Sequence, residues 1–317
     1  MEKTMDILTM FSRIAKTAAV LVFACAVLTG SNPVDHSDLP IDARSIGMAG
    51  ACTSTAFGVE AVFYNPAGLV KLQGRELSSM MSAGMAYDRT FNFIGIASNP
   101  GFENKLSAAI AWINAGWGGG FKGYDDFDNL TGEFDVKENS LLVSFAEYLD
   151  YLNLNWGATV KMLNSSVSNK NVSGFGLDVG ILYDLGTWKR FTNVIIAATA
   201  RDAYSKVDDE KVDPTIKFGV SGSIAPNLFG AFDLGFITGD DRKTSYALGV
   251  EYRYGLSHIG SLNMDSAIFL PRLGLNTGDI YFGFGVEMPK FTVDYAFAPA
   301  PNSEYNNSHR FSLTLPF

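Results

Sequence analysis

Charged side chains at the polar positions of alternating segments are the residues whose chemistry stands out in this sequence. Three of them are basic, Lys161, Arg253 and Arg272, and such groups can bind the anionic headgroup of a ligand. The alternative is that the charges are solvated, or paired with one another so that they hold two parts of the molecule together. The full set is Lys161, Asp178, Lys217, Asp233, Glu251, Arg253, Arg272 and Asp294.

Aromatic side chains gather in the segment 116–138, which we predict to be a loop. Such a loop could form a groove for a hydrophobic small-molecule ligand. The alternative is that the aromatic rings pack the loop onto the rest of the protein. The acidic residues between positions 125 and 128 lack the spacing to a later glutamate that a calcium loop requires. The residues that we single out for ligand binding are Trp117, Phe121, Tyr124 and Phe127.

Motifs for catalysis or for a cofactor are missing from the sequence. The run Gly118-Gly119-Gly120 is followed by Lys122, but the Gly-Lys-Ser/Thr core of a phosphate loop is absent. No nucleophile motif stands out, and two cysteines and three scattered histidines do not build a metal site. The net charge of −9 argues against a nucleic-acid partner. We therefore predict a non-enzymatic protein with no cofactor, no metal and no nucleic acid.

The first 30 residues are typical of a secretory signal peptide. Arg13 and Lys16 precede an apolar run from Thr17 to Leu28, and small residues follow it. A membrane-crossing helix needs about 20 apolar residues, so this run is too short to be one. The alternative is an N-terminal anchor or a buried helix.

The remainder of the chain alternates between apolar and polar residues. In the range 280–287, Ile, Phe and Val occupy the even positions, whereas Tyr, Gly and Glu occupy the odd ones. The same period recurs in 175–183, 244–254 and 291–297. Because successive side chains of a strand point to opposite faces, these segments are predicted to be half-apolar β-strands.

Two architectures explain the alternation, a soluble sandwich and a membrane β-barrel. A sandwich turns its apolar face inward, whereas a membrane barrel turns it outward to lipid and keeps a polar, Gly-rich lumen. Strands of about 10 residues, aromatic residues at strand ends and alternating loop lengths favour the barrel. The sequence has 32 glycines and 13% aromatic residues, which fits this choice.

We predict an all-β fold, a transmembrane antiparallel barrel of about fourteen strands. The long connections are 115–138, 202–214 and 299–307, and the segment 255–265 interrupts the pattern. The strands are expected near 76–85, 91–98, 104–114, 139–148, 153–165, 173–184, 190–201, 215–224, 228–237, 244–254, 266–275, 279–287, 289–298 and 308–317.

The segment between the leader and the first strand is small, rich in Gly and Ala, and does not alternate. It contains Asp42 to Ala51, which reads DARSIGMAGA, and Phe63 to Leu69, which reads FYNPAGL. Small residues let backbones pack closely, so the segment suits a compact plug inside a lumen. The pattern resembles the N-terminal region of FadL-type outer-membrane transporters, and more closely their PorV-like, spirochaetal branch. Shorter matches follow at 132–134, 178–180 and 294–297.

The resemblance implies a signal peptide (1–30), a plug or hatch (31–75) and an outer-membrane barrel (76–317) in a bacterial cell. It implies uptake of hydrophobic compounds such as long-chain fatty acids, which leave the barrel sideways into the membrane lipids. The alternative is a PorV-like accessory barrel that binds secreted proteins. The terminal alternating strand resembles the signal that outer-membrane assembly machinery reads, with Phe317 at its end. The expected hatch residues are Gly47, Met48, Gly50, Asn65, Pro66, Ala67 and Gly68.

Overall fold

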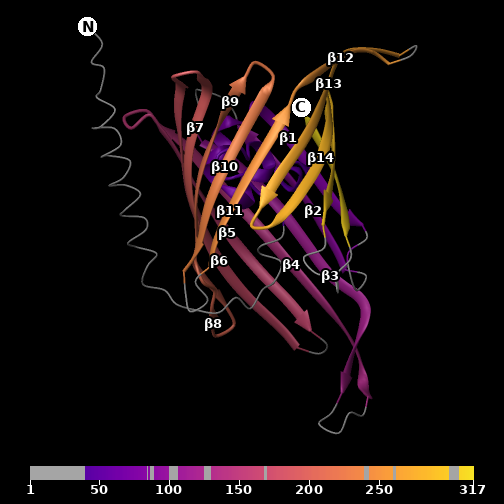
Figure 1. Cartoon of the computed structure of the whole chain (residues 1–317). Coiled ribbons are helices and arrows are strands. Elements are labelled where there is room, and N and C mark those ends of the chain that lie inside the picture. Colours follow the sequence, from indigo (N-terminus) through magenta and orange to yellow (C-terminus); the bar gives the residue numbers. More distant parts are fainter. Residues whose placement is uncertain are drawn as a thin grey trace.

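The computed structural model describes residues 40–83, 85, 89–99, 106–124, 130–167, 170–238, 243–259, 262–299 and 307–317. Four short helical turns come first: α2 (Ala43–Gly47), η2 (Gly58–Glu60), α3 (Ala61–Tyr64) and η3 (Pro66–Lys71). Strands make up almost all of the rest (Figure 1). They are β1 (Gly74–Ala83), β2 (Arg89–Asn99), β3 (Leu106–Tyr124), β4 (Leu130–Leu149), β5 (Leu154–Val167), β6 (Lys170–Trp188), β7 (Phe191–Val207), β8 (Glu210–Lys211), β9 (Thr215–Ala225), β10 (Leu228–Ile237), β11 (Lys243–Tyr252), β12 (Tyr254–Ile259), β13 (Leu262–Asn276), β14 (Asp279–Met288), β15 (Phe291–Ala298) and β16 (Ser308–Pro316).

The strands form one antiparallel sheet that closes on itself. β1 pairs with both β2 and β16, and β11 pairs with β13 to complete the ring. β12 continues β11 along the same partner strand, and β8 is a short strand beside β7. Fourteen strand positions therefore surround the lumen, as the sequence predicts. Closure pairs the strand edges that an open sheet would leave exposed.

The outer face of the barrel is apolar. On β14, Phe282 and Phe284 are 47% and 43% exposed, whereas the alternate residues Gly283 and Gly285 are buried on the inside. A closed barrel with an outward apolar band is built to face lipid. In the described part of the chain, no helix has the length and apolar character that crossing a membrane requires.

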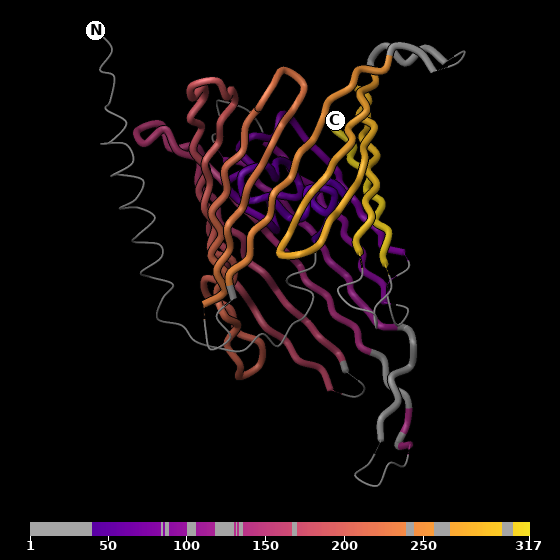
Figure 2. Tube along the Cα trace, in the orientation of Figure 1, coloured from indigo at the N-terminus to yellow at the C-terminus, as the bar shows by residue number. Residues whose placement is uncertain are grey.

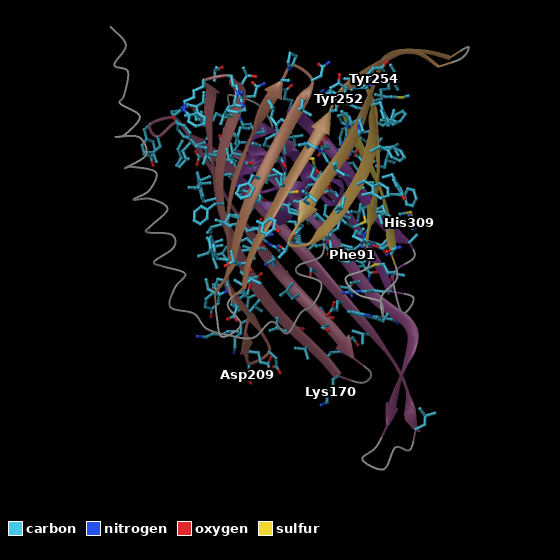
Figure 3. All side chains as sticks on the ribbon, in the orientation of Figure 1. Phe91, Lys170, Asp209, Tyr252, Tyr254 and His309 are labelled. Atoms are coloured by element: carbon cyan, nitrogen blue, oxygen red, sulfur yellow. The ribbon has the colours of Figure 1, made fainter. Side chains whose placement is uncertain are left out.

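The two ends of the barrel differ in their side chains, and the hairpins at one end differ in how far they extend. Figure 3 places Tyr252 and Tyr254 at the end with short turns, and Lys170 and Asp209 towards the opposite end. Both tyrosines are exposed, at 43% and 56%, as expected of an aromatic girdle at a membrane interface. Figure 2 shows that the hairpins of β3–β4 and β5–β6 reach much further than the hairpin of β13–β14.

The prediction of a loop at 115–138 is wrong, because the structure has a β-hairpin there. β3 runs to Tyr124 and β4 starts at Leu130, and the two strands pair as far as Tyr124 opposite Leu130. The run of three glycines and the acidic residues hide this extension, because neither fits an apolar–polar alternation. The segment therefore lengthens the wall as a hairpin.

Residues 40–72 lie inside the barrel, where Figure 1 shows them in indigo. Their apolar residues pack against inward-facing residues of the wall, such as Phe91, Phe93 and Ile113. On β2 and β3 the inner face is thus apolar, whereas the sequence analysis expects a polar lumen throughout. The plug occupies this part of the lumen, and its apolar surface explains the apolar wall. The division at residues 30 and 75 stays a prediction, and residues 1–39 lie outside the described residues.

Candidate functional site

The Asn65–Gly68 element fixes the plug to the wall at β5 and β6. Asn65 is fully buried, and its Nδ2 donates to the carbonyl oxygens of Thr53 (2.9 Å) and Ile181 (3.2 Å). Its Oδ1 accepts from the backbone N–H of Ala67 at 3.2 Å, which caps η3, and Pro66 occupies the first turn. One asparagine thus joins two parts of the plug and one wall strand.

Two wall glycines make this contact possible. A Cβ atom at Gly180 would lie 2.0 Å from Asn65 Oδ1, and one at Gly157 would lie 2.5 Å from the carbonyl carbon of Pro66. The two glycines face each other on β5 and β6. The plug backbone therefore rests directly on the wall at a place where no other residue type fits.

The predicted hatch residues Gly47, Met48 and Gly50 lie against β11, β13 and β14, away from the contact of the plug with β5 and β6. Asp42 begins α2, and its Oδ1 accepts from the backbone N–H of Ser45 at 2.7 Å. A Cβ atom at Gly47 would lie 3.3 Å from the Cα of Gly283 on β14. Met48 fills the space above two other wall glycines, on β11 and β13, and Gly50 takes the left-handed conformation with φ +86°.

Buried ion pairs hold this side of the plug. Arg44 of α2 contacts Glu251 Oε2 at 3.0 Å, and Arg272 contacts the same oxygen at 2.7 Å. Arg272 also contacts Asp294 at 2.5 Å. The side chain of Asp233 accepts from the backbone N–H of Cys52 at 2.9 Å, and burial raises the pKa of that thiol. These inward charges are therefore occupied by one another or by the plug.

Lys161 and Arg253, the other two basic residues singled out in the sequence analysis, do not contact the ion pairs around Arg272. Lys161 contacts Asp178 at 2.8 Å and also pairs with Asp202, and all three residues are buried. Arg253 is exposed and pairs with Glu287 at 3.1 Å. The structure thus does not bring Lys161, Arg253 and Arg272 together, and each of them has a carboxylate partner.

A cavity of about 390 Å³ lies on the long-hairpin side of the plug. Its floor includes Ile46, Ala49 and Phe63, and Tyr64 adds a hydroxyl group whose pKa burial raises. Trp117 lines the wall of the cavity, and its contact with a ligand stays a prediction. The cavity is open to a ligand with an apolar body.

Basic residues dominate the charge of this cavity. Its lining holds four cations, Arg89, Arg201, Lys217 and Arg310, and one carboxylate, Asp233. The guanidinium of Arg201 lies 4.2 Å from the ring centroid of Phe63, and that of Arg89 lies 4.0 Å from the ring of Trp117. The lining thus combines aromatic faces with an excess of positive charge.

Arg310 is a buried cation whose printed contacts carry no negative charge within the described part of the chain. It is 3% exposed, and its Nε has no hydrogen-bond partner among the described residues. Its contacts are Met85 Sδ, 2.9 Å from Nη1, and the ring of Phe91, whose centroid is 5.8 Å away. A buried charge without an opposite charge is costly, so this position favours an anionic partner.

A second cavity of about 340 Å³ lies on the other face of the plug. Six carboxylates and three arginines line it, so its charge balance is opposite to that of the first cavity. Asp42 and Arg44 face this second cavity, whereas Ile46 and Ala49 face the first one. The short helix α2 thus separates a basic chamber from an acidic one.

The sequence analysis misses Arg89, Arg201 and Arg310. Arg310 stands at a polar position of the terminal alternating strand, which is the signal that could have found it. Phe121 and Tyr124 belong to the far part of β3, and Phe127 lies outside the described residues. Within the described ranges, no group of three His, Cys, Asp or Glu side chains could hold a metal ion.

No protein-family model matches this sequence, and no curated protein does. Solved structures do match. The CymD monoaromatic hydrocarbon channel aligns with a TM-score of 0.62 at 13% identity, over 87% of this chain and 97% of the channel. The toluene transporter TbuX of Ralstonia pickettii has a TM-score of 0.61 at 12% identity, over 88% of this chain and 99% of the transporter.

A FadL homologue of Pseudomonas aeruginosa aligns with a TM-score of 0.53 at 10% identity, over 86% of this chain and 97% of the homologue. The fold is that of FadL-type barrels. Even-stranded antiparallel barrels with short turns at one end and long hairpins at the other are characteristic of the bacterial outer membrane. The basic cavity of this protein lies on the side of its long hairpins, which is the external side in bacterial outer-membrane barrels.

Proposed function

We propose that this protein takes up small hydrophobic compounds across the bacterial outer membrane. The observation that carries the proposal is the 390 Å³ cavity, which is closed by the plug on one side and lined by Phe63, Trp117 and Ile46. Burial of an apolar ligand against such a lining is favourable, because it removes apolar surface from water. Two of the solved structures with this fold are described as a monoaromatic hydrocarbon channel and a toluene transporter, which supports the same class of cargo.

The finer proposal is that the cargo includes amphiphiles with a carboxylate, such as long-chain fatty acids. The charge of the cavity lining supports it, since four cations face one carboxylate. Arg310 is central, because its contacts in the described structure are a thioether and an aromatic ring. A ligand carboxylate would supply the missing opposite charge, and a hydrogen bond to a charged group contributes about 1.5–3 kcal/mol.

The roles of the plug and of the terminal strand belong to the same proposal. The plug blocks the direct path along the lumen, and its anchor at Asn65 ties it to β6. Movement of the plug when a ligand binds is an expectation that follows from the proposal. Recognition of the strand that ends at Phe317 by assembly machinery, and contact of the outer apolar band with membrane lipids, are further parts of it.

The test is binding and uptake by the refolded mature barrel, with a labelled long-chain fatty acid and labelled toluene as probes. Ala298 lines the cavity at its rim, is partly exposed and packs beside Ile46 of the plug, so Ala298→Phe narrows the cavity where the wall meets the plug. We expect saturable binding in the wild type and a loss of about tenfold or more in affinity in this variant. The matched control is Val293→Phe on the lipid-facing side of the same strand.

Two outcomes would count against uptake. If neither probe binds saturably, the cavity is not a hydrophobic binding site. If Ala298→Phe and Val293→Phe behave alike, any binding takes place outside the cavity. Either result would turn attention to the PorV-like accessory role, for which capture of secreted proteins is the direct assay.

A further inference from the structure

A groove on the outer face of the barrel is not used by the proposed function. It has a volume of about 430 Å³, and residues of β1 to β4 line it. Its large apolar side chains include Ile96, Ile110 and Phe145, which are 42%, 46% and 47% exposed. The neighbouring Ala97 and Ala109 are 1% and 6% exposed and belong to the core around the plug. The groove therefore opens away from the lumen, towards the bilayer.

Two small residues form the floor of the groove. Ser98 and Ala108 face each other on β2 and β3, and both are half-buried. Phe145 stands opposite Ala108 on β4, and the pair of Ile96 and Ile110 forms the next outward row. Successive outward side chains of a strand stand side by side on one face. Small side chains between large ones therefore leave a depression in a lipid-facing wall.

The groove lies near the end of the barrel that has short turns. Phe317 lines it, and the backbone N–H of Arg75 donates to the carbonyl oxygen of Phe317 at 3.1 Å. Figure 1 marks the C-terminal end of the chain at the same end of the barrel as β12, and Figure 3 places Tyr254 there. Short turns are periplasmic in bacterial outer-membrane barrels. The groove thus faces the leaflet on the periplasmic side.

Two polar side chains stand at one wall of the groove. Arg75 and Ser98 face each other on β1 and β2, and both line the groove. Arg75 is exposed, and a long basic side chain near the end of a membrane span reaches towards the headgroups. A guanidinium group matches the geometry of a phosphate, and a serine hydroxyl can donate to an ester carbonyl.

We propose that the groove binds one glycerophospholipid of the periplasmic leaflet, with an acyl chain over Ser98 and Ala108 and the phosphate at Arg75. The chain, ester and phosphate follow one another along such a lipid, and the groove offers a partner to each. This site differs from the general contact between the outer apolar band and the bilayer, because one lipid is held at one place. It does not depend on uptake, since the 390 Å³ cavity lies inside the barrel.

Packing and the phosphate, rather than the hydrophobic effect, would hold the lipid. An acyl chain leaves other acyl chains when it enters the groove, so no apolar surface is removed from water. It gains dispersion contacts in a depression that matches its width, and these contacts add up over the chain. Filling the depression should therefore remove most of the affinity, whereas removing the charge of Arg75 should weaken it less, because an exposed ion pair contributes little.

The test is native mass spectrometry of the refolded barrel titrated with dioleoyl phosphatidylethanolamine. We expect the wild type to retain one lipid saturably. Ala108→Phe, which fills the floor of the groove, should weaken retention about tenfold or more, and Arg75→Gln should weaken it about threefold. The matched control is Ala198→Phe, since Ala198 is a half-buried outward alanine between Ile181 and Phe218 on another part of the wall. Its retention should stay within about twofold of the wild type.

Dioleoylglycerol, which lacks the phosphate, separates the two contributions. Ala108→Phe should weaken its retention, whereas Arg75→Gln should leave it unchanged. Equal retention of the phospholipid by Ala108→Phe and Ala198→Phe, or no saturable adduct in the wild type, would overturn the site. An equal effect of Arg75→Gln on both lipids would overturn the contact between Arg75 and the phosphate.

A further variant separates this site from the internal cavity. Ala298→Phe narrows that cavity and should leave the phospholipid adduct unchanged, even if it abolishes the binding of a fatty acid. A phospholipid with a photoreactive diazirine in its acyl chain should crosslink to β2, β3 or β4 near Ser98 and Ala108. Loss of the adduct in Ala298→Phe, or crosslinks confined to the plug, would place the lipid inside the barrel and contradict the proposal.

Discussion

Arg272 and Arg310 are both inward-facing arginines of the same barrel, and they are 4% and 3% exposed. Arg272 lies between two carboxylates, Glu251 at 2.7 Å and Asp294 at 2.5 Å. Arg310 has a methionine sulfur and a phenylalanine ring instead. Burial and charge alone therefore do not identify a ligand-binding residue. The partner decides whether a buried cation is structural or available to a ligand.

The same contrast holds for the regions around the two residues. Arg272 and Glu251 connect the wall to Arg44 of the plug, so their charges stabilise the closed lumen. Arg310 faces the cavity with Arg89, and the two like charges repel each other. The first region is satisfied without a ligand, whereas our proposal places a ligand carboxylate in the second.

The largest loss of stability should come from breaking the buried ion pairs of Arg272. Arg272→Met leaves Glu251 and Asp294 buried without this partner, which we expect to lower the free energy of unfolding by about 3–5 kcal/mol. Arg310→Met removes a buried cation that has no carboxylate partner among the described residues, so we expect the stability to stay equal or to rise. Urea unfolding of both refolded variants in the same detergent measures the difference. Equal destabilisation by the two substitutions would mean that the partners do not distinguish the two arginines.

A smaller effect is expected where the plug touches the wall without charge. Gly180→Ala places a methyl group where Asn65 Oδ1 lies, and overpacking of this kind costs about 1–3 kcal/mol. Proteolysis of the plug in the folded barrel, together with the urea midpoint, reports whether the anchor has opened. The control is Gly255→Ala, since no atom within 4 Å meets a Cβ there. An unchanged Gly180→Ala protein would show that the anchor tolerates a shift of Asn65.

The smallest effect concerns pH. Burial, and then the neighbouring Glu76, raise the pKa of Glu60 in the plug well above its ordinary value of 4.5. The folded state therefore binds more protons than the unfolded state above that pH, and stability should fall as pH rises through this window. Glu60→Gln should flatten this dependence. Urea midpoints measured from acidic to alkaline pH check it, and a slope that Glu60→Gln leaves unchanged would assign the effect to another group.

The strands could be predicted from sequence because alternation is a local property. The predicted strand 279–287 and the observed β14 (Asp279–Met288) differ by one residue at one end. The far parts of β3 and β4 could not be found in this way, since their three glycines and acidic residues carry no periodic signal. A hairpin there depends on pairing between the two strands, which the sequence of either strand alone does not show.

The partners of the charged residues could not be predicted. The alternation of side chains places Lys161 on the inner face, but it does not show that Asp202, two strands along the wall on β7, reaches it over Gly176 of β6. The same holds for Arg310, because the residues that surround it in the described part of the barrel, Met85 and Phe91, are known only once the barrel closes. The NPAG element was the better guide, because Asn65 and Pro66 contact their surroundings through the backbone geometry that their residue types impose.

The central claim is tested most directly by comparing a long-chain fatty acid with its neutral methyl ester as ligands of the refolded barrel. We predict that the wild type binds the acid about tenfold to a hundredfold more tightly, in line with one charge-assisted hydrogen bond. Arg310→Met should lose this preference and keep its affinity for the ester, whereas Arg253→Met, in the acidic chamber, should behave as the wild type. Equal affinity of the wild type for acid and ester, or a preference that survives Arg310→Met, would contradict the assignment of Arg310 as the anion-binding residue.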